Sequence, residues 1–316
     1  MIPKPTVFIL GAGASVPYGF PTGSQLTKNI CKNVWNGNYL TDIAKEISPH
    51  WESDARLLAD QLAKATISID TWLSHRTDQE KNIGKYLIAR AIIEHESLDN
   101  LREAFTDDKD WYADLWAMLL PLESRGGVKY LYENAPVAFI TFNYDRSLEQ
   151  SLITKVQSTF RDSIEDCAKV IAERFPIIHV HGQLGRLPWQ NNLEVSGIKI
   201  RDYDSACDLK TAFASAAHIK IMGEDNGVEG PYRAARTLLE EAERIHFLGF
   251  GYHDENLKRL KPRKLQPKAT IGGTHLNLGE GRKETFQTNS NAFGYAINMK
   301  HDFKNVLDYF RNAVWK

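Results

Sequence analysis

The sequence is poor in cysteine, has no dominant charge and lacks a long hydrophobic run. Its three cysteines, Cys31, Cys167 and Cys207, lie far apart, and no two of them form a CxxC pair. A zinc ribbon and a disulfide framework are therefore excluded, and we expect a cytoplasmic protein, because the cytoplasm keeps thiols reduced. No stretch of about 18 apolar residues occurs, so we predict no membrane-spanning helix and no membrane partner.

Acidic and basic residues nearly cancel. There are 39 Lys and Arg residues against 40 Asp and Glu residues, for a net charge of −1. This balance offers no overall basic surface to nucleic acid or to an anionic membrane. Residues 258–268 (KRLKPRKLQPK) hold six basic residues and two prolines and predict an extended, solvated surface loop. A phosphate, protein or nucleic-acid contact at this loop stays open.

Short apolar runs separated by helical patterns carry the fold prediction. With 316 residues, 42% of them hydrophobic, the chain can bury a substantial core. The predicted strands are 7–10, 137–142, 177–180, 219–222 and 245–250, with weaker candidates at 269–272 and 295–299. Helical patterns at 232–244 and 302–312 alternate with them. We predict an α/β fold built on a Rossmann-like, doubly wound parallel sheet.

The first two predicted strands are separated by more than a hundred residues, which is too many for a single crossover helix. Several stretches of this segment have apolar residues at helical spacing. We therefore predict a large all-helical insertion at 37–129, within a core formed by 1–36 and 130–316. Five of the seven tryptophans lie in or beside the insertion: Trp35, Trp51, Trp72, Trp111 and Trp116.

A glycine-rich turn, GAGAS at 11–15, follows the first predicted strand. Small residues at such a turn let backbone amides approach an anion, so the turn has the outline of a diphosphate cradle. Val16 stands where the G-x-G-x-x-G fingerprint has its third glycine, and no Gly-Lys-Ser/Thr follows as in a Walker A loop. A tight strand-to-helix turn without a ligand explains the same residues.

Polar residues follow the next two predicted strands. Asn143 and Asp145 come directly after 137–142, and a buried carboxamide at a strand end needs partners for its donor and its acceptor. Asp145 also fits a helix cap. His179 and His181 are two residues apart, which predicts that they share one face of a strand. We favour His181 as a general base over a packed, hydrogen-bonded histidine pair, and either over a metal-binding pair.

The late segment GFGYHDEN, at 249–256, ends another predicted strand. Gly249 and Gly251 permit close approach of the backbone to a ribose or an adenine. Asp254 fits a helix cap at least as well as a ligand contact.

Taken in order, GAGAS, TFNYD (141–145), HGQLG (181–185) and GFGYHDEN resemble the sirtuin-like superfamily. The closer resemblance is to the bacterial sirtuin-like NAD hydrolases of anti-phage defence. It covers roughly residues 6–257, and SIDTWL (68–73) and DWYADLWAMLL (110–120) resemble that family's helical segment. The resemblance implies cleavage of NAD, as a substrate, to nicotinamide and ADP-ribose, with Asn143 and His181 as the catalytic pair.

The resemblance also implies the residues that would contact NAD. They are Gly11, Ala12, Gly13, Ala14, Ser15, Pro21, Thr22, Asp145, Gly249, Phe250, Gly251 and Tyr252. Gly11 to Ser15 would lie under the diphosphate, and Asp145 and the 249–252 turn would contact the ribose and adenine.

The sequence departs from sirtuin deacylases because it has no cysteine pairs for their four-cysteine zinc module. We therefore expect no deacylation and no metal. Such a hydrolase must be restrained in healthy cells, so we expect self-assembly into a homo-oligomer, or a separately encoded partner such as a translocase-type ATPase or a nuclease. Two alternatives stay open: a non-catalytic module that binds NAD or ADP-ribose to regulate a partner, and a metal-dependent hydrolase that uses His179 and His181.

Overall fold

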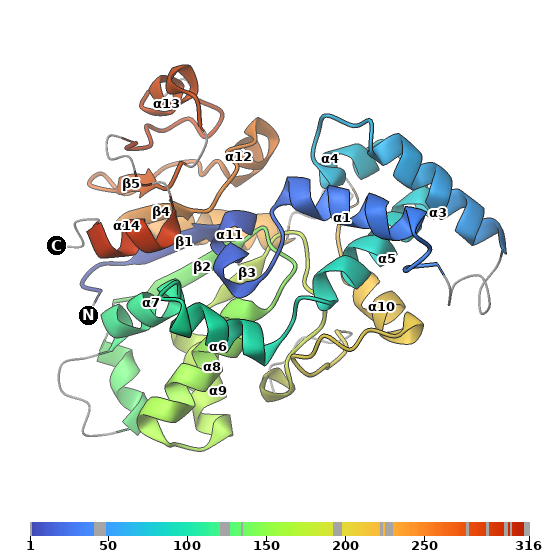
Figure 1. Ribbon diagram of the computed structural model, residues 1–316. Coiled ribbons are helices and arrows are strands. Elements are labelled where there is room, and N and C mark those ends of the chain that lie inside the picture. The colour runs from blue at the N-terminus through green and yellow to red at the C-terminus, as the bar shows by residue number, and fades with distance from the viewer. Residues whose placement is uncertain are drawn as a thin grey trace.

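The structure is a computed structural model of the 316-residue chain. It describes residues 2–40, 49–120, 127–133, 135–191, 198–221, 224, 230–275, 278–288, 291–299, 303 and 305–312. The α/β prediction is confirmed, because a five-stranded, all-parallel sheet lies among many helices (Figure 1).

The sheet has the order β3-β2-β1-β4-β5. Its strands are β1 (Thr6–Leu10), β2 (Val137–Thr141), β3 (Ile177–His179), β4 (Arg244–Leu248) and β5 (Thr270–Gly273). Every residue of β1, β2 and β4 is buried, as continuous apolar runs predict for parallel strands covered on both faces. β1 is central and pairs with β2 and β4, so the segments that follow these three strands emerge at one edge of the sheet.

Two of the predicted strands are not strands of this sheet. Residues 219–221 have no strand structure and bury Ile219 and Ile221 in a hydrophobic core, while residue 222 lies outside the described residues. The segment 295–299 makes only an isolated bridge, between Asn298 and Gly272. The first run is apolar because Ile219 and Ile221 are buried, and in the second run Ile297 and Met299 are buried while Ala296 and Asn298 are exposed. Apolar residues alone therefore do not distinguish a loop that contributes to the core from a strand.

Helices connect β1 to β2, and no strand occurs in the described part of residues 37–129. These helices are α1 (Gly23–Trp35), α3 (Pro49–Leu62), α4 (Ile69–Ser74), α5 (Asp78–Ile93), α6 (Leu98–Thr106) and α7 (Trp111–Leu119). Figure 1 shows α1, α3, α4 and α5 together beside the sheet. α1 packs against α3 and α5, so the helices of the predicted insertion continue the packing of the helix that precedes it.

The remaining helices follow β2. They are α8 (Ser147–Phe160), α9 (Ile164–Arg174), α10 (Leu209–Ala216), α11 (Gly230–Glu241), α12 (Asp254–Leu260), α13 (Glu280–Phe286) and α14 (Val306–Asn312). The predicted helix at 232–244 corresponds to α11, and α14 lies within the one at 302–312. The prediction of an extended loop at 258–268 is wrong at its start, because α12 continues to Leu260. None of the described helices combines the length and apolar character needed to cross a membrane.

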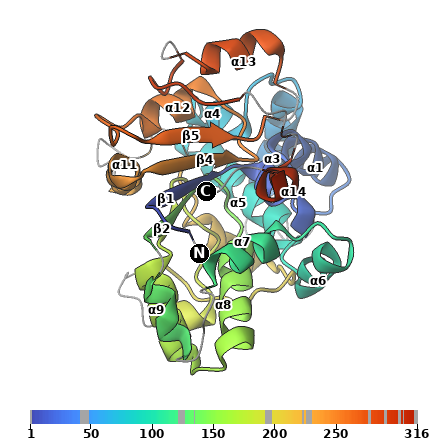
Figure 2. The same cartoon turned by 90° about the vertical axis from the view of Figure 1, so that its left-hand side faces the viewer.

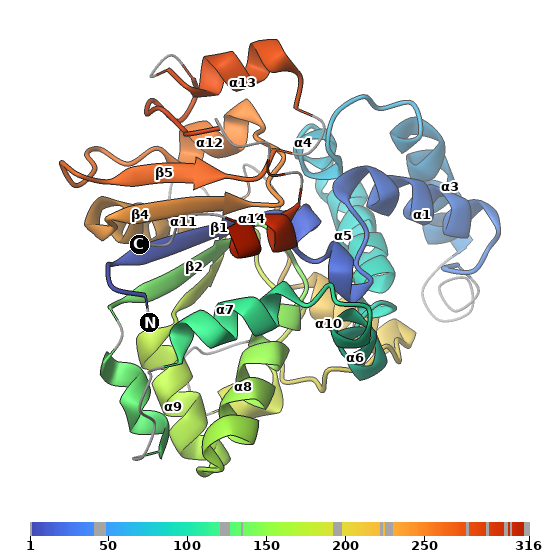
Figure 3. The ribbon, with the colours of Figure 1, turned by 60° about the vertical axis from the view of Figure 1, so that its left-hand side comes forward.

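Each face of the sheet has its own hydrophobic core. Phe8 and Leu10 point into a core shared with α7, α8, α9 and α14, whereas Val7 and Ile9 point into a second core with α11 and α12. This alternation follows from the period of two along a strand. Figures 2 and 3 show α14 and α11 on opposite sides of the strands. The core packing therefore fixes which way a side chain at a strand end can point.

Candidate functional site

The turn after β1, residues 11–15, packs directly against Gly249, the first residue after β4. Gly13 N donates to Gly249 O at 3.0 Å, and a Cβ at Gly11 would lie 2.6 Å from the same oxygen. Gly249 has a φ of +58°, and a Cβ there would lie 2.1 Å from Ala14 N. The packing of the 11–15 turn on Gly249 therefore requires glycine at Gly11 and at Gly249, whether or not a ligand binds there.

Several amides of the 11–15 turn have protein acceptors. The acceptors are Leu248 O for Gly11, Gly249 O for Gly13, Gly11 O for Ala14 and Ala12 O for Ser15, at 2.9 to 3.1 Å. The tight-turn interpretation therefore accounts for the local geometry. The diphosphate cradle stays a prediction, and its strongest structural support is the position of this turn at the carboxyl end of the central strand.

The predicted contacts that flank these turns have structural roles of their own. Thr22 begins α1 with a capping box, in which its backbone N donates to Gln25 Oε1 at 2.8 Å. Pro21, just before it, is buried. Tyr252 is buried in the second core with a φ of +52°, and its hydroxyl donates to Thr274 O at 2.8 Å.

The other predicted residues of the segment 249–256 are not equally exposed to solvent. Phe250 is buried in the second core, whereas Gly251 is exposed. Asp254 begins α12 after the cap residue His253 and lies 3.7 Å from Arg282. Asp254 therefore belongs to the first helical turn and is not the cap.

Asn143 lies two residues beyond β2 and is held from several sides. Its Nδ2 donates to Gly11 O and to Ser15 Oγ, each at 3.0 Å, so the carboxamide is fixed against the turn after β1. Its backbone N donates to Thr141 Oγ1 at 3.0 Å. Within the described residues its Oδ1 accepts no hydrogen bond. The donor side of the carboxamide is thus occupied, and the acceptor is available to a ligand or a water.

Asp145 is part of the support for Asn143. Ser15 Oγ donates to Asp145 Oδ2 at 2.8 Å, which links Asn143, Ser15 and Asp145 in a chain. The other oxygen, Oδ1, accepts from Ser147 N at 3.0 Å at the start of α8. Burial raises the pKa of Asp145, although the hydrogen bonds from Ser147 and Ser15 favour the charged form. Both carboxylate oxygens therefore have protein partners, although the N-cap of α8 is Arg146 and Asp145 lies one position before it.

His179 lies on the α8 side of the sheet. Its Nδ1 is 2.9 Å from Asn143 O, and its Nε2 is 2.6 Å from Glu149 Oε1. Burial lowers the pKa of His179, but the charge and hydrogen bond of Glu149 outweigh burial and leave the pKa raised. The pair ties α8 to the backbone of Asn143.

His181 is buried on the opposite side of the sheet from His179, against α11. Its Nε2 lies 3.4 Å from the hydroxyl of Tyr232, a residue of α11 in the second core. The prediction that His179 and His181 share one face is therefore wrong. The physical reason is that β3 ends at His179, and Val180 and His181 belong to a turn, so the strand period no longer applies.

The structure brings the segments of Asn143 and His181 together. Phe142 and Tyr144 flank Asn143, and their ring centroids lie 5.4 and 6.4 Å from that of His181. Val180 N also donates to Thr141 O at 3.0 Å, so the two strand ends are in direct contact. The carboxamide of Asn143 faces the 11–15 turn, and the ring of His181 lies among aromatic side chains.

The sequence analysis missed the residues that join the helical segment to this region. Arg146 and Glu96 form an ion pair at 2.6 Å, with both side chains 0% exposed. Arg146 also donates to the carbonyl of Asp202 at 2.8 Å, and burial lowers its pKa to about 10. Tyr144 donates to Asp70 of the SIDTWL motif.

Glu149 was missed as well, although the sequence contains a signal for it. Glu149, Leu152, Ile153 and Val156 lie on one buried stripe of α8. A charged residue at an apolar position of a helix indicates a buried partner. For Glu96 we find no comparable signal in the sequence.

Within the described residues, no three His, Cys, Asp or Glu side chains are grouped so as to hold a metal ion. Both ring nitrogens of His179 already have protein partners, so it does not form a ligand pair with His181.

Compared with models of known protein families, the chain matches none, and no curated protein matches it.

Proposed function

We propose that the protein is an NAD hydrolase that cleaves the bond between nicotinamide and ribose and releases nicotinamide and ADP-ribose. The observation that carries the proposal is the fixed carboxamide of Asn143. Its Nδ2 makes two hydrogen bonds to the 11–15 turn, and its Oδ1 is available to a ligand. This group lies at the carboxyl edge of a parallel sheet, where open α/β sheets bind their ligands.

The strand order supports a Rossmann-like core. The order β3-β2-β1-β4-β5 is that of the doubly wound dinucleotide-binding sheet, in which the ligand lies at the point where the strand order reverses. Here that point lies between β1 and β4, where the 11–15 turn meets Gly249. Most of the NAD contacts proposed above come from these two turns and from the adjacent end of β2, and Pro21 and Thr22 come from the start of α1.

The chemistry requires little of the protein. Nicotinamide departs as a neutral molecule from a positively charged ring, so no general acid is needed. The transition state resembles an oxocarbenium ion, as in glycoside hydrolysis, and the remaining tasks are positioning and removal of one proton. Oδ1 of Asn143 would accept a hydrogen bond from a ribose hydroxyl or from the attacking water, and His181 would take the proton.

We also propose that NAD hydrolysis by this protein is controlled in the cell. An uncontrolled NAD hydrolase depletes an essential cofactor, which suits an effector of anti-phage defence in the cytoplasm. The helical segment at 37–129 contacts the site through Asp70 and Glu96. It is therefore the region through which we propose that a homo-oligomer, or a partner such as a translocase-type ATPase or nuclease, controls activity.

The alternative of a non-catalytic NAD or ADP-ribose module needs neither an available carboxamide oxygen nor a nearby imidazole. The alternative of a metal-dependent hydrolase using His179 and His181 is disfavoured by the different directions of the two rings.

Chromatographic measurement of nicotinamide release tests the proposal. Asn143→Ala and His181→Ala should each lower turnover about 10²- to 10⁴-fold while NAD binding is retained. Asn191→Ala and His75→Ala, at exposed positions, serve as matched controls. Wild-type turnover in both site variants would refute the catalytic assignment. NAD binding without nicotinamide release, by the wild type alone and with its partner, would favour the binding module.

A further inference from the structure

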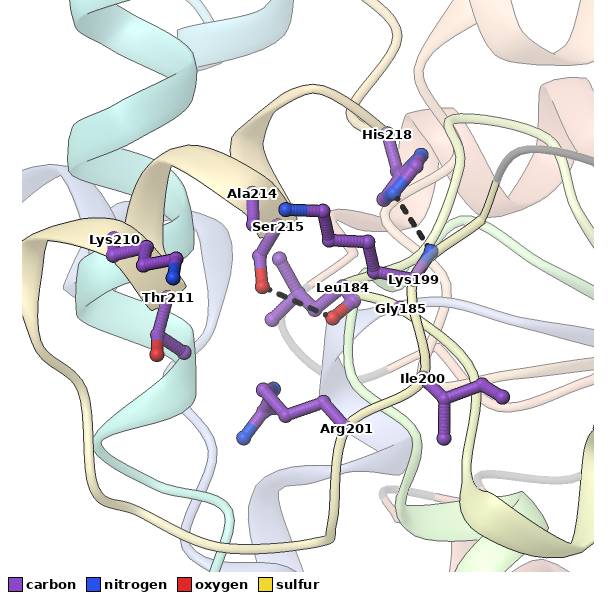
Figure 4. A pocket seen from close by; sticks show the side chains of 10 residues that line it. All are labelled: Leu184, Gly185, Lys199, Ile200, Arg201, Lys210, Thr211, Ala214, Ser215 and His218. Atoms are coloured by element: carbon purple, nitrogen blue, oxygen red, sulfur yellow. Dashed lines mark hydrogen bonds between the residues drawn. The ribbon is translucent and has the colours of Figure 1, made fainter.

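A cavity of about 170 Å³ lies between α10 and the segment that follows His181 (Figure 4). Its lining consists of Leu184, Gly185, Lys199, Ile200, Arg201, Lys210, Thr211, Ala214, Ser215 and His218. Four of these ten residues are of basic type and none is acidic. The cavity is separate from the 11–15 and 249–252 turns, because no residue of either turn lines it.

Two of the four basic side chains, those of Lys199 and Lys210, differ from Arg201 in their pairing within the part of the chain that the structure describes. Neither Lys199 nor Lys210 forms an ion pair with a described residue, whereas Arg201 pairs with the buried Glu96. In Figure 4 the side chain of Lys199 extends across the cavity towards Ser215. The charge of Lys210 helps to lower the pKa of Asp208, so this lysine has a carboxylate in its neighbourhood. The cavity lining itself has basic residues and no acidic one, which gives it a local positive potential that favours an anion.

The nearest acidic side chain on α10 is committed elsewhere. Asp208 caps the helix, and its Oδ1 accepts from Thr211 N at 2.7 Å. The hydroxyl of Thr211 also hydrogen-bonds Asp208, and this bond contributes most to the lowered pKa of that carboxyl. Ser215 is committed as well, because its hydroxyl donates to Leu184 O at 3.1 Å.

His218 completes the polar lining as a neutral ring. Its Nε2 accepts from Lys199 N at 3.2 Å, so the ring proton is on Nδ1. Burial and the charge of Lys199 both lower the pKa of His218. The strongest anion-binding groups of the cavity are therefore the two lysines.

We propose that this cavity binds the phosphoryl group of a small phosphorylated molecule, held by Lys199 and Lys210. A phosphoryl group accepts several hydrogen bonds and carries the charge that the two lysines would neutralise. The cavity is smaller than the roughly 300 Å³ or more of pockets that enclose drug-sized ligands. It therefore fits a phosphate, or the phosphorylated end of a molecule that extends into solvent.

The cavity shares a wall with the segment of His181. Leu184 and Gly185 line it, only three and four positions after His181, and Lys220 N, just beyond α10, donates to His181 O at 2.9 Å. A Cβ at Gly182 would lie 1.9 Å from His218 O, so the two segments pack backbone to backbone. Binding in the cavity would therefore shift the His181 segment and change the rate of NAD cleavage, a consequence that rests on the proposed function.

Titration calorimetry on the full chain tests the site directly, with inorganic phosphate, ribose 5-phosphate and AMP as probes. At least one probe should bind, and Lys199→Gln and Lys210→Gln should each weaken it about tenfold, as expected for loss of one charge-assisted hydrogen bond. Lys169→Gln, at an exposed position of α9, should leave the affinity unchanged. Tighter binding of ribose 5-phosphate or AMP than of phosphate would identify a phosphorylated small molecule and not the free ion.

Absence of binding by all three probes would overturn the proposal, as would equal affinities for the two lysine variants and the Lys169→Gln control. The calorimetric result does not depend on enzymatic activity, so it stands whether or not nicotinamide is released. The coupling is tested separately, by nicotinamide release with and without the bound probe. A rate that changes in the wild type but not in Lys199→Gln supports the coupling, and an unchanged wild-type rate rejects it.

Discussion

Glu149 Oε1 lies 2.6 Å from His179 Nε2, and neither side chain is more than 7% exposed. Because His179 Nδ1 also faces Asn143 O at 2.9 Å, this buried pair connects α8 to the residue that we propose as catalytic. Asn143 is thus supported through its backbone by His179 and through its carboxamide by Gly11 and Ser15.

The pair predicts a specific dependence of stability on pH. The folded protein raises the pKa of His179, so its contribution to stability is complete below the unfolded value of about 6.5 and is lost as the pH rises through the folded value. Glu149→Gln should remove this dependence and lower the free energy of unfolding by about 3 kcal/mol on the acidic side. Urea denaturation over a pH series measures both effects.

The exposed Glu241→Gln variant should follow the wild type throughout that series. Parallel stability curves for the wild type and Glu149→Gln would contradict the assigned pair.

Ser15 is predicted to act as a positioning residue. Ser15→Ala removes the acceptor for Asn143 Nδ2 and the donor to Asp145 Oδ2. We expect kcat for nicotinamide release to fall about tenfold or more with little change in KM, because a less constrained carboxamide loses its alignment. Ser158→Ala, exposed on α8, is the matched control. An equal kcat for Ser15→Ala and the control would exclude the positioning role.

The Glu96 and Arg146 pair should contribute strongly to folding. Glu96→Gln preserves the shape of the side chain but leaves a buried guanidinium without its counter-charge, which typically lowers stability by about 3 to 5 kcal/mol. Glu103→Gln, exposed on α6, should change stability by less than about 0.5 kcal/mol. Chemical denaturation of the two variants provides the comparison, and similar midpoints would show that the pair is dispensable.

Gly249 should tolerate no side chain. Gly249→Ala places a Cβ 2.1 Å from Ala14 N at a φ of +58°, so the β1 and β4 turns must separate. We expect a loss of roughly 3 kcal/mol or more in the free energy of unfolding. Gly281→Ala, in α13 where a Cβ meets open space, should instead stabilise by up to about 1 kcal/mol. Thermal unfolding distinguishes the two, and an unchanged melting temperature for Gly249→Ala would contradict the packing.

The sequence by itself determined the strands that form the sheet and the polar residues that follow them. A continuous apolar run between Gly or Pro residues, as at β1, can hardly be satisfied except by burial on both faces. The same local logic located Asn143 after β2. It failed at 219–221, because a buried loop and a buried strand have the same composition.

Only the tertiary structure decided which way the polar side chains face and with which groups they pair. Glu149 approaches His179, and Glu96 approaches Arg146, across 30 and 50 residues of chain. The close packing of Gly249 on the β1 turn likewise joins segments that lie far apart in sequence. Local propensity carries no information about such contacts, because each depends on how the helices and strands pack around a shared core.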